Sequence, residues 1–518
     1  MASGAKKPRK AKKFPSTFPD TCPTGCNEPC FAATIDPHQK SNYGKAGRQE
    51  QSSPMNGPYQ RKSQRRIFGA VLAMLAMAGC SVVPVYKAPG FPFAKSFSRS
   101  SAPILLDNAA WWKRFDDPVL NRLVETALRG NLDLKIARER VTEARARTGT
   151  VPLAAGLTGS VSAEQRSTTT FAESTTTATE GGAEASFGFG WLFDPYGGRK
   201  ALQAAAAARV EVADAELDAA RLLLLSSITT TYIDLRYSQR ALQLRQQELQ
   251  SRRRTLRLVR DLTEGKLATR LDLIRAEALV SETQGLIPPL QAAAQIRSNE
   301  IAVLLGLAPG AANMVLGGAG GQPQADLPAE IGIPADLLRN RPDIRIAERM
   351  YYAAVADIGV AKADLYPTLS LGGTITLSTF NGPVTAATQF GPSLRLPALP
   401  DSPRRATVAV RESRASQAHA TWASQVLGAI RDVESALAEY AGSLASVQAS
   451  RQTVRLYSEA VELTREQIAR DGATIRDLLD AEQSVAAARI ALAQNLRELG
   501  QNFVVLNVGL GSGNGYEP

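Results

Sequence analysis

Two stretches of the chain alternate strictly between apolar and polar positions, as β-strands with two unlike faces do. They cover Ala183–Phe193 and Leu369–Ser378, and weaker runs lie before Thr170 and after Gln389. For a single strand the pattern fits a soluble antiparallel sheet with one wet face, and it also fits a membrane strand beside an aqueous lumen. The apolar positions are Ala183, Ala185, Phe187, Phe189, Trp191 and Phe193 in the first run and Leu369, Leu371, Ile375 and Leu377 in the second.

Two much longer segments, Arg199–Glu264 and Arg404–Arg470, are rich in strong helix formers and contain no proline. At 1.5 Å per residue, each predicts a helix of roughly 100 Å. A helix of that length is typical of a coiled-coil-like rod and exceeds what a globular domain needs.

Shorter helices are predicted on both sides of each long one. Helices of about half the length follow at Thr269–Leu307 and Thr474–Asn507, and others precede near 116–147 and 336–364. Because a helix depends on packing along its apolar stripe, we expect two short helices, placed end to end, to cover each long one.

The chain repeats itself internally, which also determines its domain organisation. Two motifs recur in the same order at offsets of 210 and 205 positions: Asp133–Arg140 matches Asp343–Arg349, and Ala268–Glu277 matches Ala473–Glu482. We therefore predict a tandem duplication with halves at 107–325 and 326–513, followed by a short tail at 514–518. The hairpins of long and short helices turn near Gly265 and Gly472.

An export signal lies in front of the repeats, at residues 55–79. Basic Arg61–Arg66 precedes the uncharged run Ile67–Ala78, which is too short to span a bilayer, and Gly79-Cys80 follows. This pattern predicts cleavage before Cys80 and lipidation of its thiol, with residues 80–106 as a lipidated linker. The alternative is an ordinary secretory signal that happens to end in Cys.

The first 54 residues are rich in Pro and Lys and show no hydrophobic period. We interpret residues 1–54 as a disordered extension or the product of a misplaced start codon, because a start at Met55 gives a signal of ordinary length. Cys22, Cys26 and Cys30 lie here, but this run lacks the fourth ligand of a usual zinc site. No metal or other cofactor is predicted.

The net charge of +11 is concentrated in this leader, because nine of the excess positive charges precede Cys80. The repeats are therefore nearly neutral, and a basic groove for nucleic acid is not predicted. The repeats contain a single histidine, His419, so catalytic triads and multi-histidine metal sites are poorly supported and no enzymatic activity is expected.

Four alternating runs in an exported chain favour a membrane β-barrel over a soluble sheet. Four strands cannot close a barrel, and an open edge in lipid leaves backbone groups without partners. We therefore expect the chain to oligomerise. The predicted fold is mainly α with a membrane β-barrel, in which tandem long helical hairpins carry four strands per chain.

At this point the sequence resembles the outer-membrane factor family, the TolC-like proteins, and within it the lipidated NodT-type efflux subunits. The matching segments cover most of residues 107–510 in order: Trp111–Leu120, Gly130–Leu134, Phe193–Arg199, Arg341–Ile344, Ala347–Glu348, Ile358–Ala363, Tyr366–Leu371 and Phe390–Leu394. The segment Leu396–Arg405 departs from the family pattern, because three prolines replace the Asp/Gly-rich turn that the first repeat has at Phe193–Arg199.

The resemblance implies a homotrimer with a 12-stranded β-barrel and a periplasmic α-barrel. It implies a passive channel, anchored in the outer membrane by lipid and extending into the periplasm, that carries drugs or similar small molecules outward. Its partners would be a periplasmic adaptor (membrane fusion protein), an inner-membrane pump and outer-membrane lipid. The alternatives are a periplasmic adaptor, which needs only one hairpin, and a structural coiled-coil lipoprotein, which would lack the strand pairs.

The resemblance also implies a gate at the hairpin ends. Asp477 and Asp480 match paired acids that ring the closed periplasmic entrance in the family, and spacing i, i+3 places them on one helix face. Asp272 and Arg275 hold the equivalent positions in the first repeat. A closing ion pair across neighbouring hairpins is expected between Arg275 and Asp480, or equally through Arg270 or Arg476. From the sequence pattern alone, the favoured interpretation is that these charged residues form the solvent-exposed side of an amphipathic helix.

Overall fold

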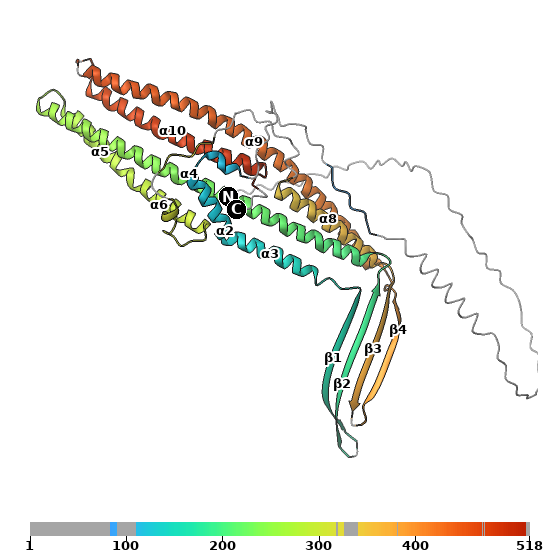
Figure 1. Ribbon diagram of the computed structural model, residues 1–518. Helices are drawn as coiled ribbons and strands as arrows, with labels where there is room; N and C mark the ends of the chain where they lie inside the picture. The colour runs from blue at the N-terminus through green and yellow to red at the C-terminus, as the bar shows by residue number, and fades with distance from the viewer. Residues whose placement is uncertain are drawn as a thin grey trace, which may run out of the picture. The chain divides into compact units, whose positions relative to one another are not determined.

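The computed structural model describes residues 83–90, 110–172, 174–316, 320–325, 340–380, 382–468, 470 and 472–513 (Figure 1). Cys80, the signal at 55–79, the extension at 1–54 and the tail at 514–518 lie outside the described residues, as does most of the linker. In chain order the elements are η2 (Trp111–Phe115), α2 (Pro118–Gly130), α3 (Leu132–Thr148), β1 (Ala155–Thr170), β2 (Thr176–Phe193), α4 (Gly198–Glu264), α5 (Arg270–Gly285), α6 (Ile287–Leu304), α7 (Asn313–Leu316), α8 (Pro342–Ala363), β3 (Thr368–Phe380), β4 (Thr385–Arg395), α9 (Ser402–Ile468) and α10 (Ile475–Gly509).

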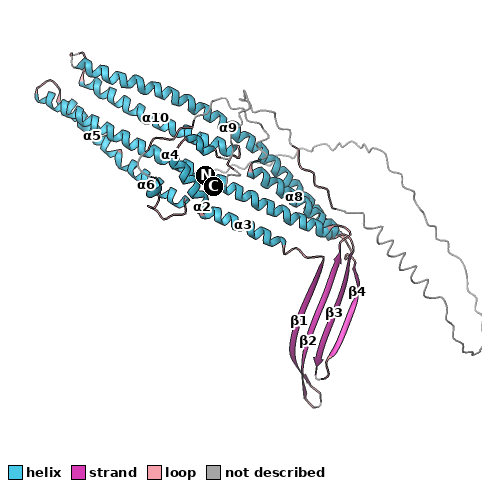
Figure 2. Ribbon diagram, in the orientation of Figure 1, coloured by secondary structure: helices cyan, strands magenta, loops and turns pink. Residues whose placement is uncertain are grey.

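The four strands form one antiparallel sheet in the order β1-β2-β3-β4 (Figure 2). The expectation of a mainly helical chain with four strands is confirmed. The two weaker runs are strands as long as 16 and 11 residues, and β4 begins four residues before the predicted start at Gln389.

The register of the sheet places the apolar positions of all four strands on one face. Phe189 of β2 lies opposite Leu157 of β1, and Trp191 lies opposite Leu371 of β3. Residues that face each other across antiparallel strands point to the same side of the sheet. The opposite face carries hydroxyl and charged residues: Thr158, Ser160, Ser162, Glu164, Glu184, Ser186, Ser370, Thr374, Thr376 and Ser378.

Helices α4 and α9 have 67 residues each, and shorter helices pack along them as expected. Helices α3 and α2 cover one part of α4, and α5 and α6 cover another, while α8 and α10 both pack against α9. Helices α8 and α10 also pack against α4, so they join the two halves of the chain. The sequence did not predict this second set of contacts.

Two of the predicted single helices are each divided into two. Near 116–147 the chain forms α2 and α3 because Asn131 leaves the helical conformation and its side chain accepts a hydrogen bond from the Leu134 amide. Between Thr269 and Leu307 the helix is interrupted at Leu286, and the prolines at the start of α6 lack the N–H groups that a continuous helix needs.

The largest core lies where the middle of α4 meets η2, α2, α9 and α10. Trp111, Trp112, Phe115, Tyr232 and Phe503 are almost fully buried there. The Tyr232 hydroxyl donates a 2.7 Å hydrogen bond to Asp117, which also caps α2. This core holds the two halves together at a level between the sheet and the hairpin turns.

Candidate functional site at the hairpin turns

Each long helix reverses direction in a short turn at the end remote from the sheet (Figure 1). Helix α4 ends at Glu264, and Lys266 takes a positive φ of 62° before α5 begins at Arg270. Helix α9 ends at Ile468, and α10 begins at Ile475. The predicted gate residues all lie within the first turns of α5 and α10.

Both second helices begin with the same capping box. Thr269 precedes α5 and Thr474 precedes α10, and each hydroxyl accepts a hydrogen bond from the amide of the aspartate three residues later. In return, Asp272 accepts bonds from the hydroxyl and amide of Thr269, and Asp477 accepts the same two from Thr474. These bonds satisfy amide groups that a helix start leaves without partners.

The capping bonds also affect the ionisation of both aspartates. The hydrogen bond from the Thr269 hydroxyl is the largest of the effects that lower the pKa of Asp272 below its ordinary value. The Thr474 hydroxyl lowers the pKa of Asp477 in the same way. Both carboxylates are therefore ionised at neutral pH, and both are engaged by their own helix.

The side chain of Asp480 is held less tightly than that of Asp477, the other predicted acid of α10. Its carboxylate lies 3.8 Å from the guanidinium of Arg476, and both side chains are about 70% exposed. Arg275 lies 4.0 Å from Asp272 on its own helix. Within one chain the structure therefore pairs Arg275 with Asp272 and Asp480 with Arg476, and it does not bring Arg275 to Asp480.

A buried carboxylate just beyond these residues was missed by the sequence analysis. The Glu482 side chain is 6% exposed and accepts a 2.9 Å hydrogen bond from Arg465 of α9. It also accepts bonds of 3.1 Å from the hydroxyls of Ser251 and Thr255 on α4. Because Glu482 belongs to α10, this cluster joins three helices and both repeats.

The internal repeat of the sequence could have pointed to the pair of Arg465 and Glu482. Arg465 and Glu482 lie 205 positions after Arg260 and Glu277, the same offset that relates Thr474 to Thr269. Arg260 and Glu277 also form an ion pair, at 3.4 Å, but both of these side chains are about half exposed. This Arg–Glu pair therefore recurs at the same position in both hairpins, and only in the second is its glutamate buried.

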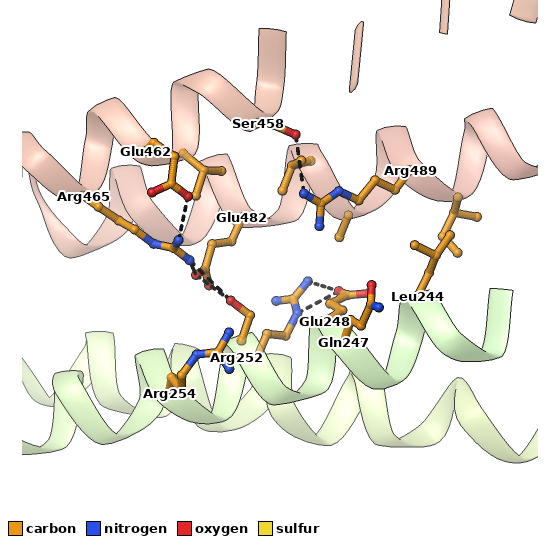
Figure 3. Close-up of a pocket in the computed structure, with 15 residues that line it drawn as sticks. Leu244, Gln247, Glu248, Arg252, Arg254, Ser458, Glu462, Arg465, Glu482 and Arg489 are labelled. Atoms are coloured by element: carbon orange, nitrogen blue, oxygen red, sulfur yellow. Dashed lines mark hydrogen bonds and ion pairs between the residues drawn. The ribbon is translucent and has the colours of Figure 1, made fainter. Parts of the chain in front are cut away.

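A cavity of about 280 Å³ lies beside Glu482, between α4, α9 and α10. Figure 3 shows Arg465 and Glu482 at one end of it and the pair of Glu248 and Arg252 on the α4 side. Glu248 and Arg252 are joined by a hydrogen bond of 2.8 Å and are both more than nine-tenths buried. The lining is polar and ionic along most of its length.

None of the helices described has both the length and the apolar character to cross a membrane. Among the same residues, no group of three or more His, Cys, Asp or Glu side chains is arranged to hold a metal ion. His419 packs against the rings of Tyr351 and Trp422, with centroid distances of 5.2 and 5.8 Å.

Both the sequence and the fold of this chain are similar to those of known proteins. The chain is 34% identical over 456 residues to nodulation protein T of Rhizobium leguminosarum bv. trifolii, covering 86% of this chain and 96% of that protein. It is 28% identical to outer membrane protein OprJ of Pseudomonas aeruginosa, covering 86% and 95%. The solved outer-membrane channel OprN has a TM-score of 0.76 at 28% identity, covering 84% of this chain and all but 1% of that one.

A family model, outer membrane efflux protein, matches residues 123–307 and again residues 333–512. These two segments contain the two hairpins and all four strands of the described sheet. The chain therefore belongs to the outer membrane efflux protein family, as the resemblance in its sequence indicated.

Proposed function

We propose that this chain is the outer-membrane channel subunit of a tripartite efflux system, a passive conduit for small molecules. The observation that carries the proposal is the two-faced sheet. One face presents large apolar side chains from all four strands to the surroundings, among them Leu157, Phe189 and Phe390, while the other face is polar. A sheet with these faces fits lipid on one side and water on the other.

Closure of the barrel requires further copies of the chain. Strands β1 and β4 are paired on one side only, so each leaves an edge with free N–H and C=O groups. Such edges are not tolerated in the hydrocarbon region of a bilayer. Three chains of four strands would form the 12-stranded barrel of the proposed homotrimer, with the long hairpins as a periplasmic tunnel.

The partners follow from the same proposal. The hairpin turns would meet a periplasmic adaptor (membrane fusion protein) that connects to an inner-membrane pump, and the chain itself would supply no catalytic step. Lipidation at Cys80 would add an anchor in the outer membrane to the barrel. The relatives include a protein named as a cation efflux system protein and another named for pyoverdine export, so family membership leaves the exported molecule open.

The proposed gate is refined by the geometry of the hairpin turns. Asp477 is held by its capping bonds, whereas the Asp480 side chain is largely exposed and lies 3.8 Å from Arg476. We therefore assign the ring of charge at the entrance mainly to Asp480, supported by Asp477. Arg275 and Asp272 would form the corresponding charged pair of the first repeat.

The test is reconstitution of the full purified chain into planar lipid bilayers. A trimeric channel gives discrete conductance steps, and it migrates as a high-mass band on unboiled gels that shifts to the monomer after boiling. A structural coiled-coil lipoprotein, the main alternative, would give the helical signal in circular dichroism without conductance or a heat-sensitive band. That result would refute the channel.

A further inference from the structure

The cavity between α4, α9 and α10 has an unequal set of charges. Five arginines and three glutamates line it or bond to its lining: Arg245, Arg252, Arg254, Arg465, Arg489, Glu248, Glu462 and Glu482. In a partly enclosed volume, water screens such a surplus of positive charge less well than it does at an open surface. The cavity therefore attracts anions.

Each of the three carboxylates already has partners. Glu248 is bonded to Arg245 at 2.7 Å and to Arg252 at 2.8 Å. Glu482 accepts from Arg465, Ser251 and Thr255, and Arg465 also donates to Glu462 at 2.9 Å. No carboxylate of the lining is left for the remaining guanidinium groups.

The remaining donors come from both sides of the cavity. The side chain of Arg252 is 7% exposed, and its Nη1 is buried without a hydrogen-bond partner. Arg489, on α10, has one long bond of 3.5 Å to Ser458. Figure 3 shows Arg489 reaching into the cavity from the side opposite Arg252. A buried N–H group without a partner destabilises the folded chain, and a bound acceptor would remove that cost.

We propose that this cavity is a binding site for a small oxyanion, held between Arg252 of α4 and Arg489 of α10. Guanidinium groups match carboxylate and phosphate oxygens in geometry and make charge-assisted hydrogen bonds to them. The volume of about 280 Å³ holds such an ion together with several water molecules. The inference does not depend on the proposed channel, because it concerns only the interior of one chain.

The bound ion has a structural consequence for the hairpins. Helix α4 belongs to the first repeat and α10 to the second, so an oxyanion bonded to both joins the two hairpins next to the Glu482 cluster. Inorganic phosphate and the carboxylate of a small organic molecule present the same oxygen chemistry to this site.

The test titrates the full-length protein, purified in detergent, with sodium phosphate in a calorimeter at constant ionic strength. We expect saturable binding of one phosphate per chain. Arg489→Gln and Arg252→Gln should each weaken it at least about tenfold, which corresponds to about 1.4 kcal/mol. Arg253→Gln is the matched control, because Arg253 is exposed on α4 next to Arg252 and does not line the cavity.

A competition arm identifies the source of the oxyanion. Displacement of phosphate by sodium acetate at the same ionic strength supports a carboxylate ligand, and failure of acetate to compete supports an inorganic one. Two results would overturn the site: no saturable binding of either anion, or phosphate binding that is equally strong in Arg489→Gln and in Arg253→Gln. Arg489 is exposed, so its variant remains informative even if Arg252→Gln does not fold.

Discussion

Arg465 of α9 and Glu482 of α10 form a 2.9 Å ion pair that two hydroxyl groups of α4 complete. The equivalent pair of the first hairpin, Arg260 and Glu277, lacks such a neighbour and remains exposed. The duplication thus supplied the same pair twice, and only one copy was placed against the other repeat. The second pair therefore contributes a contact between the two hairpins, through the hydroxyls of α4.

Replacement of Glu482 by Ala should therefore destabilise the hairpin ends. The change leaves Thr255, which is buried, and Arg465 without their acceptor, and we expect a loss of about 1 to 3 kcal/mol. Arg465 is 42% exposed, which keeps the effect below that of a fully buried pair. Hydrogen exchange of the α10 amides and the thermal unfolding midpoint would measure it.

The matched control is Glu277→Ala. Glu277 has the same position in the first repeat, but its pair with Arg260 is exposed, so its loss should cost less than about 1 kcal/mol. Equal effects of the two substitutions would show that the contact with α4 contributes nothing.

The capping boxes give a second prediction. Thr474→Val removes the hydroxyl that bonds to Asp477 and should cost about 1 kcal/mol of local stability at the start of α10. Exchange of the amides in the first turn of α10 should become several times faster, while amides in the middle of α10 stay protected. Thr269→Val should do the same to α5, and Thr464→Val, which lies inside α9, serves as the control.

The same boxes predict a dependence on pH. The pKa of Asp477 is lowered in the folded chain, so the stability it contributes is complete above its ordinary value of 3.8 and is lost as pH falls through the lower folded-state pKa. Protection of the first turn of α10 should be constant from about pH 7 to pH 5 and should fall only in stronger acid. A decline already near neutral pH would assign the protection to another group.

Much of the fold could be predicted from the sequence because local patterns determine it. The alternation from Ala183 to Phe193 requires one wet and one apolar face, and the proline-free run of α4 requires a long helix. The Thr-x-x-Asp spacing of both capping boxes is equally local. The sequence analysis assigned Asp272 and Asp477 to the gate and overlooked their bonds to the helix start.

Contacts between distant parts of the chain could not be predicted in this way. The burial of Glu482 depends on Ser251 and Thr255, which lie 231 and 227 positions away on α4. A glutamate in a charged helical motif is usually exposed, and no periodicity of α10 alone distinguishes Glu482 from Glu277. The packing of α8 against both long helices is a tertiary property of the same kind.

The proposed gate predicts different effects for the two acids of α10. Asp480→Asn removes an exposed charge without disturbing the capping box, so it should lower cation selectivity and raise single-channel conductance in planar bilayers. Asp477→Asn should change selectivity less and loosen the first turn of α10 in hydrogen exchange. If Asp480→Asn leaves both conductance and selectivity unchanged, Asp480 does not line the constriction.

The two faces of the sheet predict opposite results for the same substitution. Phe189 lies on the apolar face of β2 and Ser186 on its polar face. An arginine on a lipid-exposed face costs about 2 to 4 kcal/mol near the middle of the bilayer, whereas one beside water costs little. Phe189→Arg should therefore reduce assembly of the proposed trimer and its recovery in outer membranes, while Ser186→Arg should assemble and alter conductance. Normal assembly of Phe189→Arg together with failure of Ser186→Arg would mean that lipid contacts the other face.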